Sequence, residues 1–411
     1  MPSPTMSFST FCIFECSLSD FLDLILLTKF LIFCLLGVDN LKVLIAGGGT
    51  AGHINPALAI ADTIKKQKPD ADILFVGTPK GMESRLVPSR GYKISPIDVR
   101  GFQRKISVKN VGRNASAVIK AFTSSLQAKK IVKDFVPDIA VGTGGYVSGP
   151  IIRACQKAGV KTVIHEQNSF PGVTTKLLSK NADAVMLASE DAKEHLDKGL
   201  NIFVTGNPVR EEFFSLDKKT VREKLGISQD KFVVLSFGGS LGARSINTAA
   251  AEIIASNKNN KDIVFIHSYG QYGKWFPDLL TQKGVDISSE NLDVREYIDN
   301  ISQCMAAADI LICRAGAITL SEITVLGKAS ILIPSPNVAE NHQYYNALAL
   351  AKRDAAVIVE ERELAGNKLI KVFSELYQEK DKLQILSENS KKLALPDTNS
   401  RIYGIINDLL T

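Results

Sequence analysis

Residues 41–64 read LKVLIAGGGTAGHINPALAIADTI, an apolar run followed by glycines and then by a stretch with helical spacing. A continuous apolar run of this length is typical of a strand that is buried on both faces of a parallel sheet. Pro56 stands near the start of the following stretch, where a helix tolerates proline because its first N–H groups lack partners within the helix. The segment therefore predicts a strand, a glycine turn and a helix, the opening unit of a doubly wound α/β domain.

The same pattern starts again 191 residues later, counted from Gly47 to Gly238. Residues 230–254, DKFVVLSFGGSLGARSINTAAAEII, again place paired glycines between an apolar run and a helical stretch. Further apolar runs follow each copy, at 71–77, 137–145, 161–166, 181–189 and 201–206 and then at 262–270, 308–316 and 329–336. This alternation predicts two Rossmann-like, doubly wound domains that face a central cleft.

The chain length of 411 residues agrees with two domains, because a single hydrophobic core rarely serves more than about 250–300 residues. We place the first domain at residues 39–207 and the second at 208–395, since the stretch after Asn207-Pro208 has the character of a linker with a short helix. Residues 396–411 are expected to form a helix that packs back on the first domain.

The N-terminal residues 1–38 do not fit the α/β pattern. Residues 21–38, FLDLILLTKFLIFCLLGV, are apolar but contain Asp23 and Lys29, and Lys29 is the first basic residue of the chain. A spanning helix needs about 20 apolar residues, and a signal peptide needs an early basic region. A weak membrane anchor, a disordered leader and residues upstream of the true start are the three interpretations, and we favour the last.

Basic residues concentrate between residues 90 and 133. This segment holds eleven Lys or Arg and one acid, Asp98, whereas the net charge of the whole chain is only +6. Apolar residues such as Phe102 and Phe122 lie among the cations, and such a face favours an anionic lipid surface. We expect no nucleic-acid partner, because the few aromatic residues of this segment do not alternate regularly with the cations.

The sequence predicts neither a metal site nor a bound cofactor. The six cysteines form no CxxC pair, and the five histidines are scattered. Asp70-Ala71-Asp72 precedes a strand, where acidic residues are typical of a turn. A nicotinamide cofactor would need an acidic residue at the end of the second strand, but that strand ends Phe75-Val76-Gly77-Thr78.

His53 follows the first glycine turn and falls in the first turn of the expected helix. The positive end of the helix dipole disfavours a cationic imidazole, so we expect a neutral ring that accepts a proton from a hydroxyl group. The glycines let backbone amides approach an anionic ligand. A histidine that only caps the helix is the alternative.

Two further motifs of the first domain follow strands. GTGGYVSGP at 142–150 is a second glycine-dense turn, whose amides are candidates for a diphosphate site, with packing against the first glycine turn as the alternative. HEQN at 165–168 places four hydrogen-bonding side chains at the carboxyl end of a strand, the edge of the sheet where α/β proteins bind ligands.

The second domain carries three corresponding motifs. GGSLGAR at 238–244 repeats the first glycine turn, and RAGAITLSE at 314–322 crosses from a strand to a helix with amides suited to phosphates. Glu322 is placed to hold vicinal ribose hydroxyls, and compensation of the helix dipole is the alternative. ENHQYYN at 340–346 gathers amides and a histidine suited to sugar hydroxyls.

Together these motifs resemble those of the MurG family, the peptidoglycan N-acetylglucosaminyltransferases. The resemblance covers residues 41–411 and rests on GGGTAGHINPALA, GTGGYVSGP, HEQN, GNPVR, GGSLGAR, RAGAITLSE and ENHQYYNA. It implies the GT-B fold and an inverting, metal-free transfer of N-acetylglucosamine from UDP-N-acetylglucosamine to lipid I, which forms lipid II. It also implies a peripheral position on the cytoplasmic face of the cell membrane, with wall-synthesis proteins as partners.

The resemblance assigns roles to individual residues. His53 matches the position proposed as the catalytic base, Glu322 matches the ribose contact and the backbone of Ile298 matches the uracil contact. The other donor-side positions are Thr50, Ala51, Gly52, Asn168, Arg210, Ser240, Ala317, Ile318, Thr319, Gln343 and Asn346. The acceptor-side positions are Tyr146, His165 and Glu166.

Three residues depart from the family pattern. Ala51 stands where many members have glycine, and Ala315 replaces a common serine, but neither change removes a required side chain. His342 occupies a place that is glutamine in some relatives, so the sugar contact is expected from Gln343 instead.

Three other functions remain open at this stage. A GT-B transferase with a diacylglycerol-type acceptor would share the donor motifs, and a UDP-N-acetylglucosamine epimerase would share the fold but need no basic apolar face. A catalytically silent, membrane-bound partner of a wall-synthesis complex would need neither His53 nor Glu322.

Overall fold

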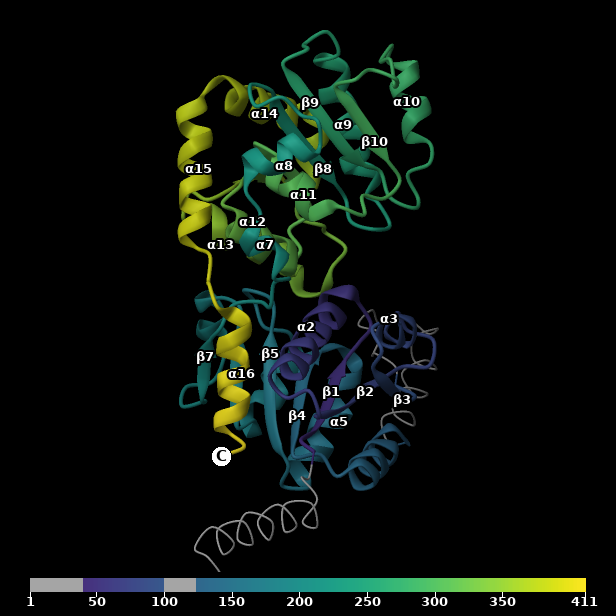
Figure 1. The fold of residues 1–411 in the computed structure, drawn as a ribbon, viewed down its shortest axis with the longest axis vertical. Coiled ribbons are helices and arrows are strands. Elements are labelled where there is room, and N and C mark those ends of the chain that lie inside the picture. Colours follow the sequence, from purple (N-terminus) through teal and green to yellow (C-terminus); the bar gives the residue numbers. More distant parts are fainter. Residues whose placement is uncertain (1–39, 100–122) are drawn as a thin grey trace, which may run out of the picture. The chain divides into compact units, whose positions relative to one another are not determined.

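The computed structural model describes residues 40–99 and 123–411. The predictions for the leader 1–38 and for the middle of the basic segment, residues 100–122, lie outside the described residues. Residues Lys42–Thr411 form one compact unit that contains two parallel β-sheets, each with helices packed against it (Figure 1).

The first sheet has seven strands in the order β3-β2-β1-β4-β5-β6-β7, and every neighbouring pair is parallel. Its strands are β1 (Lys42–Gly47), β2 (Asp72–Gly77), β3 (Lys93–Pro96), β4 (Ile139–Gly144), β5 (Lys161–Glu166), β6 (Ala184–Leu187) and β7 (Ile202–Val204). The register is set along the central strands, where Ile45 pairs with both Phe75 and Val141.

The second sheet has six parallel strands in the order β10-β9-β8-β11-β12-β13. Its strands are β8 (Phe232–Phe237), β9 (Ile263–Ser268), β10 (Leu292–Arg295), β11 (Ile310–Cys313), β12 (Ala329–Leu332) and β13 (Val357–Ile358). The first strand of each half, β1 or β8, lies inside its sheet with later strands added on both sides. This doubly wound order confirms the α/β fold with two parallel sheets that the repeated glycine turns predict.

The helices of the first half are α2 (Ala51–Gln67), α3 (Glu83–Ser89), α5 (Gly145–Lys157) and α6 (Val173–Leu178), together with helical residues 123–135. Those of the second half are α7 (Glu212–Ser215), α8 (Lys218–Lys224), α9 (Arg244–Ser256), α10 (Phe276–Gln282), α11 (Ile301–Ala307), α12 (Ala317–Leu326), α13 (His342–Ala351), α14 (Lys368–Gln378) and α15 (Lys380–Lys392). The last helix is α16 (Thr398–Asp408). Within the described ranges, no helix is both long enough and apolar enough to cross a bilayer.

The sheets are buried because their strands are apolar on both faces, as expected for parallel sheets covered by helices. Val43, Leu44 and Ile45 of β1 are fully buried, and Ile60 and Ile64 of α2 pack toward them with helical spacing. The last helix, α16, contacts α2 of the first half, and Figure 1 shows it beside the first sheet. The chain thus crosses from the second sheet back to the first.

The first two glycine turns pack directly against each other. An added Cβ atom on Gly145 would lie 2.1 Å from the carbonyl oxygen of Gly48, and one on Gly47 would lie 2.0 Å from Oγ1 of Thr143. Gly145 also has a φ of +79°, a conformation that side chains with a Cβ atom rarely adopt. Packing therefore explains most of this glycine density, whereas Gly49 faces open space, with nothing within 4 Å of its added Cβ.

We expect Gly145→Ala to lower the free energy of unfolding by roughly 2–6 kcal/mol, because positive φ and overpacking each cost about 1–3 kcal/mol. Urea unfolding measures this difference. Gly149→Ala is the matched control on the same helix, since its added Cβ meets nothing within 4 Å. Equal stability of the two variants would contradict the proposed packing constraint.

Candidate active site

Three neighbouring strands of the first sheet bring the predicted polar residues together. β1, β4 and β5 are adjacent and parallel, so their carboxyl ends lie at one edge of the sheet. β1 leads into the turn before His53, β4 carries Thr143 near its end, and β5 ends at Glu166. This is the edge at which open α/β sheets bind ligands.

His53 is held by its Nδ1 atom. This nitrogen lies 3.0 Å from the backbone oxygen of Thr143 and 3.0 Å from Oε1 of Gln167. Both partners are oxygens that only accept hydrogen bonds, so Nδ1 carries the proton. In the neutral ring, Nε2 is therefore the basic nitrogen. The side chain is half-buried in the first turn of α2, and its Nε2 atom is chemically able to accept a proton from a hydroxyl group.

His165 and Glu166, which are predicted on the acceptor side, are enclosed by protein. His165 is 0% exposed and Glu166 is 4% exposed. The carboxylate of Glu166 accepts hydrogen bonds from the backbone and side chain of Asn168, from Gly172 and from Thr175. These hydrogen bonds tie the end of β5 to the loop that follows it.

The sequence interpretation missed Glu83 at the start of α3. This residue is fully buried, and its carboxylate accepts bonds from the amide and hydroxyl of Thr78 and from the amide of Gly49, at 3.2 Å. Burial alone would raise the pKa of Glu83, but these hydrogen bonds outweigh it and hold the pKa below its ordinary value. The Gly49 amide of the first glycine turn therefore already donates a hydrogen bond to a carboxylate of the protein, that of Glu83. No local sequence signal links residues 49 and 83.

Asn346 joins the two halves. It is 2% exposed, its Oδ1 accepts a bond from the Ser169 amide at 2.9 Å, and its Nδ2 donates to Oδ1 of Asn168 at 3.1 Å and to the backbone oxygen of Ala315. The two asparagines predicted on the donor side therefore bond to each other across the halves. Phe170 also stacks on Tyr345 of α13, with ring centroids 4.8 Å apart.

Arg210 and Glu322 form the charged part of the predicted donor set. The guanidinium lies 3.8 Å from Glu322, whose side chain is 15% exposed, and 2.9 Å from the more exposed Glu212. Burial raises the pKa of Glu322 to about 7, although the charge of Arg210 opposes this rise. Glu322 is thus a poorly solvated carboxylate whose one ion pair is long, an environment common at functional sites.

The other donor-side residues lie at the starts of helices and on loops of the second half. Ala317, Ile318 and Thr319 form the partly exposed first turn of α12, which Gly316 precedes. Ser240 is exposed beside Gly239, which faces open space. Ile298 is 3% exposed, so only its backbone is suited to a ligand contact.

The remaining predicted positions differ in exposure. Gln343 accepts a bond from the Ser335 amide at 2.9 Å, so its side chain is already partly engaged. Thr50, Ala51 and Gly52 open α2 on a partly exposed turn, and Tyr146 on α5 is 60% exposed.

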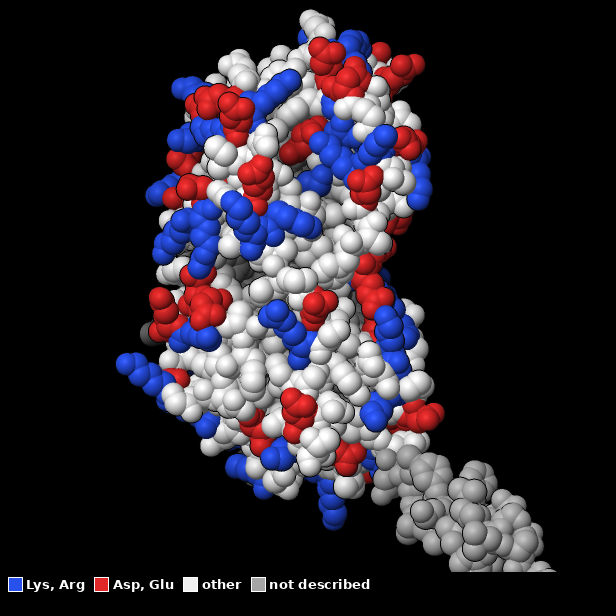
Figure 2. All heavy atoms as spheres, turned by 60° about the vertical axis from the view of Figure 1, so that its left-hand side comes forward, with Lys and Arg blue, Asp and Glu red and all other residues white. Residues whose placement is uncertain are grey.

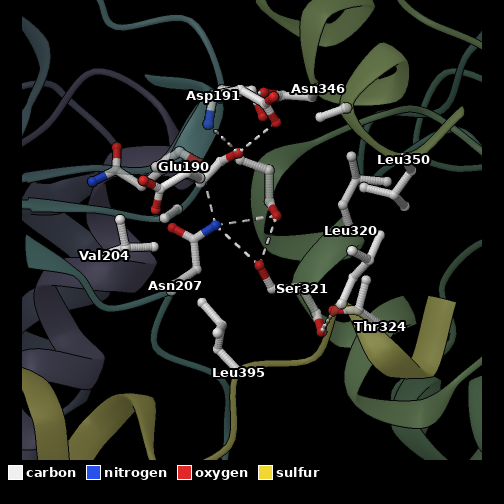
Figure 3. A pocket seen from close by; sticks show the side chains of 18 of the residues that line it. Glu190, Asp191, Val204, Asn207, Leu320, Ser321, Thr324, Asn346, Leu350 and Leu395 are labelled. Carbon is white, nitrogen blue, oxygen red and sulfur yellow. Dashed lines mark hydrogen bonds between the residues drawn. The ribbon is translucent and has the colours of Figure 1, made fainter. Parts of the chain in front are cut away.

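A cavity of 330 Å³ lies between the halves, and neither His53 nor Glu322 lines it (Figure 3). Of the predicted site residues, only Ala317 and Asn346 line it. The side-chain amide of Asn207, which lines the cavity, donates hydrogen bonds to the hydroxyl of Ser321, at 3.0 Å, and to the backbone oxygen of Ala317. Residues of both halves line the cavity, and most of the predicted site residues lie outside its lining, so we do not place the chemistry there.

Within residues 40–99 and 123–411, no three His, Cys, Asp or Glu side chains cluster closely enough to hold a metal ion.

Comparison with known families gives two matches that follow one another along the chain. Residues 43–187 match the N-terminal domain of glycosyltransferase family 28, and residues 233–402 match the C-terminal domain of that family.

Two similar proteins carry the name UDP-N-acetylglucosamine–N-acetylmuramyl-(pentapeptide) pyrophosphoryl-undecaprenol N-acetylglucosamine transferase. The one from Acetivibrio thermocellus is 43% identical over 372 residues, which cover 90% of this chain and 98% of the relative. The one from Caldanaerobacter subterraneus is 43% identical over 366 residues, which cover 89% of this chain and 99% of the relative. The crystal structure of Acinetobacter baumannii MurG is similar to this chain with a TM-score of 0.71 and 26% identity, and the match covers 90% of this chain and 99% of that structure.

We expect Glu322→Gln to stabilise the protein at pH 8 but not at pH 4.5. The folded state binds the Glu322 proton up to about pH 7, whereas the unfolded state releases it near pH 4.5, so the carboxylate lowers stability as the pH rises through this window. Thermal unfolding at both pH values measures the effect. The control is Glu211→Gln, which replaces an exposed carboxylate. An equal change in the unfolding temperature of Glu322→Gln at the two pH values would contradict the raised pKa of Glu322.

Proposed function

This chain belongs to glycosyltransferase family 28, and from that premise we propose that it transfers N-acetylglucosamine from UDP-N-acetylglucosamine to lipid I. The product is lipid II, the disaccharide-carrying lipid used in peptidoglycan synthesis. The observation that carries this proposal is the 43% identity to a transferase of that name over 98% of its length. A diacylglycerol acceptor, an epimerase activity and a silent partner lack such support.

The donor side is proposed to lie on the second half, residues 208–395. The amides at the start of α12 are suited to the diphosphate, because a helix N-terminus favours negative charge. Glu322, one turn later, is suited to accept hydrogen bonds from the ribose hydroxyls, and the backbone of Ile298 to meet the uracil. Ser240 and Gln343 border the diphosphate and the sugar in this arrangement.

The acceptor side is proposed to lie on the first half, residues 39–207, with His53 as the catalytic base. Its Nε2 atom is the basic nitrogen of the neutral ring, because Nδ1 donates to Thr143 and Gln167. Thr50, Ala51 and Gly52 belong to the same helix start, and the exposed ring of Tyr146 is available to the acceptor.

The reaction is an inverting displacement. The acceptor hydroxyl oxygen attacks the anomeric carbon as the bond from that carbon to the diphosphate breaks, and the hydroxyl proton passes to Nε2 of His53. UDP leaves with the bonding electron pair. Backbone amides at the start of α12 and the Arg210 guanidinium are placed to stabilise its developing charge, so we propose that no metal is required.

The chain is proposed to bind the cytoplasmic face of the cell membrane peripherally, through the basic segment 90–133. Lys129, Lys130 and Lys133 are exposed on helical residues 123–135, and Leu126 beside them is 53% exposed. Figure 2 shows Lys and Arg interspersed with Asp and Glu on the described part of one face. The membrane proposal rests on segment 90–133 because it holds eleven Lys or Arg and one acid, and wall-synthesis proteins are further candidate partners at that surface.

We expect the purified chain to form labelled lipid II from UDP-N-acetylglucosamine and a lipid I analogue, with the same rate in the presence of EDTA. Thin-layer separation of the labelled lipid measures the product. Absence of product would reject the transferase function, and inhibition by EDTA that added Mg²⁺ reverses would reject only the metal-free mechanism.

His53→Ala should retain UDP-N-acetylglucosamine binding while kcat falls by roughly 10²–10⁴-fold, the usual contribution of a general base. Calorimetric titration with UDP and steady-state kinetics measure the two quantities. The buried His267→Asn, on the second sheet, is a control for histidine loss elsewhere. Normal turnover of His53→Ala would remove this residue from the base role.

A further inference from the structure

Gln167 lies between two histidines and links them through its side-chain amide. Its Oε1 is 3.0 Å from Nδ1 of His53, and its Nε2 is 3.0 Å from Nδ1 of His165. The residue is 3% exposed. A side chain so enclosed acts on a reaction through its neighbours.

The far end of this link is fixed by the backbone. Nε2 of His165 lies 3.1 Å from the carbonyl oxygen of Gly206, so Nε2 carries the proton. Burial lowers the pKa of His165, which is fully enclosed, so the ring stays neutral. A neutral ring with its proton on Nε2 has an acceptor at Nδ1. His165 therefore requires a donor from Gln167.

The orientation of the Gln167 amide follows from its surroundings. Its Nε2 faces Nδ1 of His165 and also the backbone oxygen of His165, at 2.8 Å, and both of these atoms are acceptors. The reversed amide would place its oxygen against both acceptors and lose two hydrogen bonds. The oxygen of Gln167 therefore faces His53. The backbone of Gln167 is held as well, since its carbonyl accepts a bond from Asn207 at 3.2 Å.

We propose that Gln167 is a positioning residue that holds His53 in the tautomer with the proton on Nδ1 and the basic lone pair on Nε2. This role rests on the proposed function, in which Nε2 takes the acceptor proton. The hydrogen bonds of this network all run in the same direction: His53 donates to Gln167, which donates to His165, which donates to the carbonyl oxygen of Gly206. A neutral amide performs this task without a buried charge, whereas a carboxylate at the same place would need desolvation.

The test uses Gln167→Met, which keeps the length of the side chain but removes both hydrogen-bonding ends. We expect kcat to fall roughly 10-fold with the donor KM unchanged, less than for loss of the base itself because the Thr143 carbonyl still accepts a bond from Nδ1. Imidazole ¹⁵N–¹H spectra of the full chain should show one His53 tautomer in the wild type and a mixture in the variant. Gln156→Met is the matched control, because it loses a buried bond to Leu178 outside this network.

A wild-type His53 ring with its proton on Nε2 would overturn the proposal, as would a Gln167→Met protein that keeps both its kcat and a single tautomer. Gln167→Glu provides a second test, independent of how well the Met variant folds. In its protonated form, the new carboxyl group can still accept a bond from His53 and donate to Nδ1 of His165, so at a pH that keeps this group protonated the Nδ1–H tautomer should persist, and its loss there would also overturn the proposal. The spectra need no substrate, so a failure of lipid II formation would reject the proposed function without deciding the tautomer.

Discussion

The position of His53 depends on the contact between the two glycine turns of the first sheet. Gly145 approaches the carbonyl oxygen of Gly48 so closely that no Cβ atom fits between them. This approach brings the end of β4 beside the first turn of α2, where Thr143 donates its hydroxyl proton to the backbone oxygen of His53 and accepts the bond from its ring. Gly47 and Gly145 are required at this contact by space, whereas an added Cβ atom on Gly49 would meet nothing within 4 Å.

The three buried or nearly buried carboxylates near the predicted site differ in how well they are satisfied. Glu83 accepts bonds from Thr78 and Gly49, and Glu166 accepts bonds from the loop that follows it. Both stabilise the turns on which the chemistry depends. Among the described residues, the basic side chain paired with Glu322 is Arg210, at 3.8 Å, and burial raises the pKa of Glu322 to about 7, so a ligand that donates hydrogen bonds would improve its environment. The number of hydrogen bonds that each carboxylate accepts, more than its burial, thus distinguishes Glu83 and Glu166 from Glu322, the candidate ligand contact.

The segment that connects the two sheets also serves the proposed base. Gly206 accepts the bond from His165, and Asn207 bonds both to Gln167 and to the first turns of α12. Donor-side and acceptor-side elements therefore share one short stretch of backbone. Asn346 adds a second connection through Ser169 and Asn168. The candidate site is thus built around the junction of the halves, although His53 and Glu322 do not line the cavity at that junction.

The sequence by itself determined the two doubly wound sheets, because apolar strands, glycine turns and amphipathic helices are local patterns that repeat along the chain. It also identified His53 and Glu322 as candidate residues, since both stand in motifs next to strand ends. Only the tertiary structure decided that Glu83 bonds to Gly49, that His165 and Glu166 are enclosed, and that Gln167 orients His53. Each of these facts depends on which distant atoms share a buried space, and on which of them can donate a hydrogen bond. The spacing of residues along the chain does not show which distant atoms become neighbours or which of them donate a hydrogen bond.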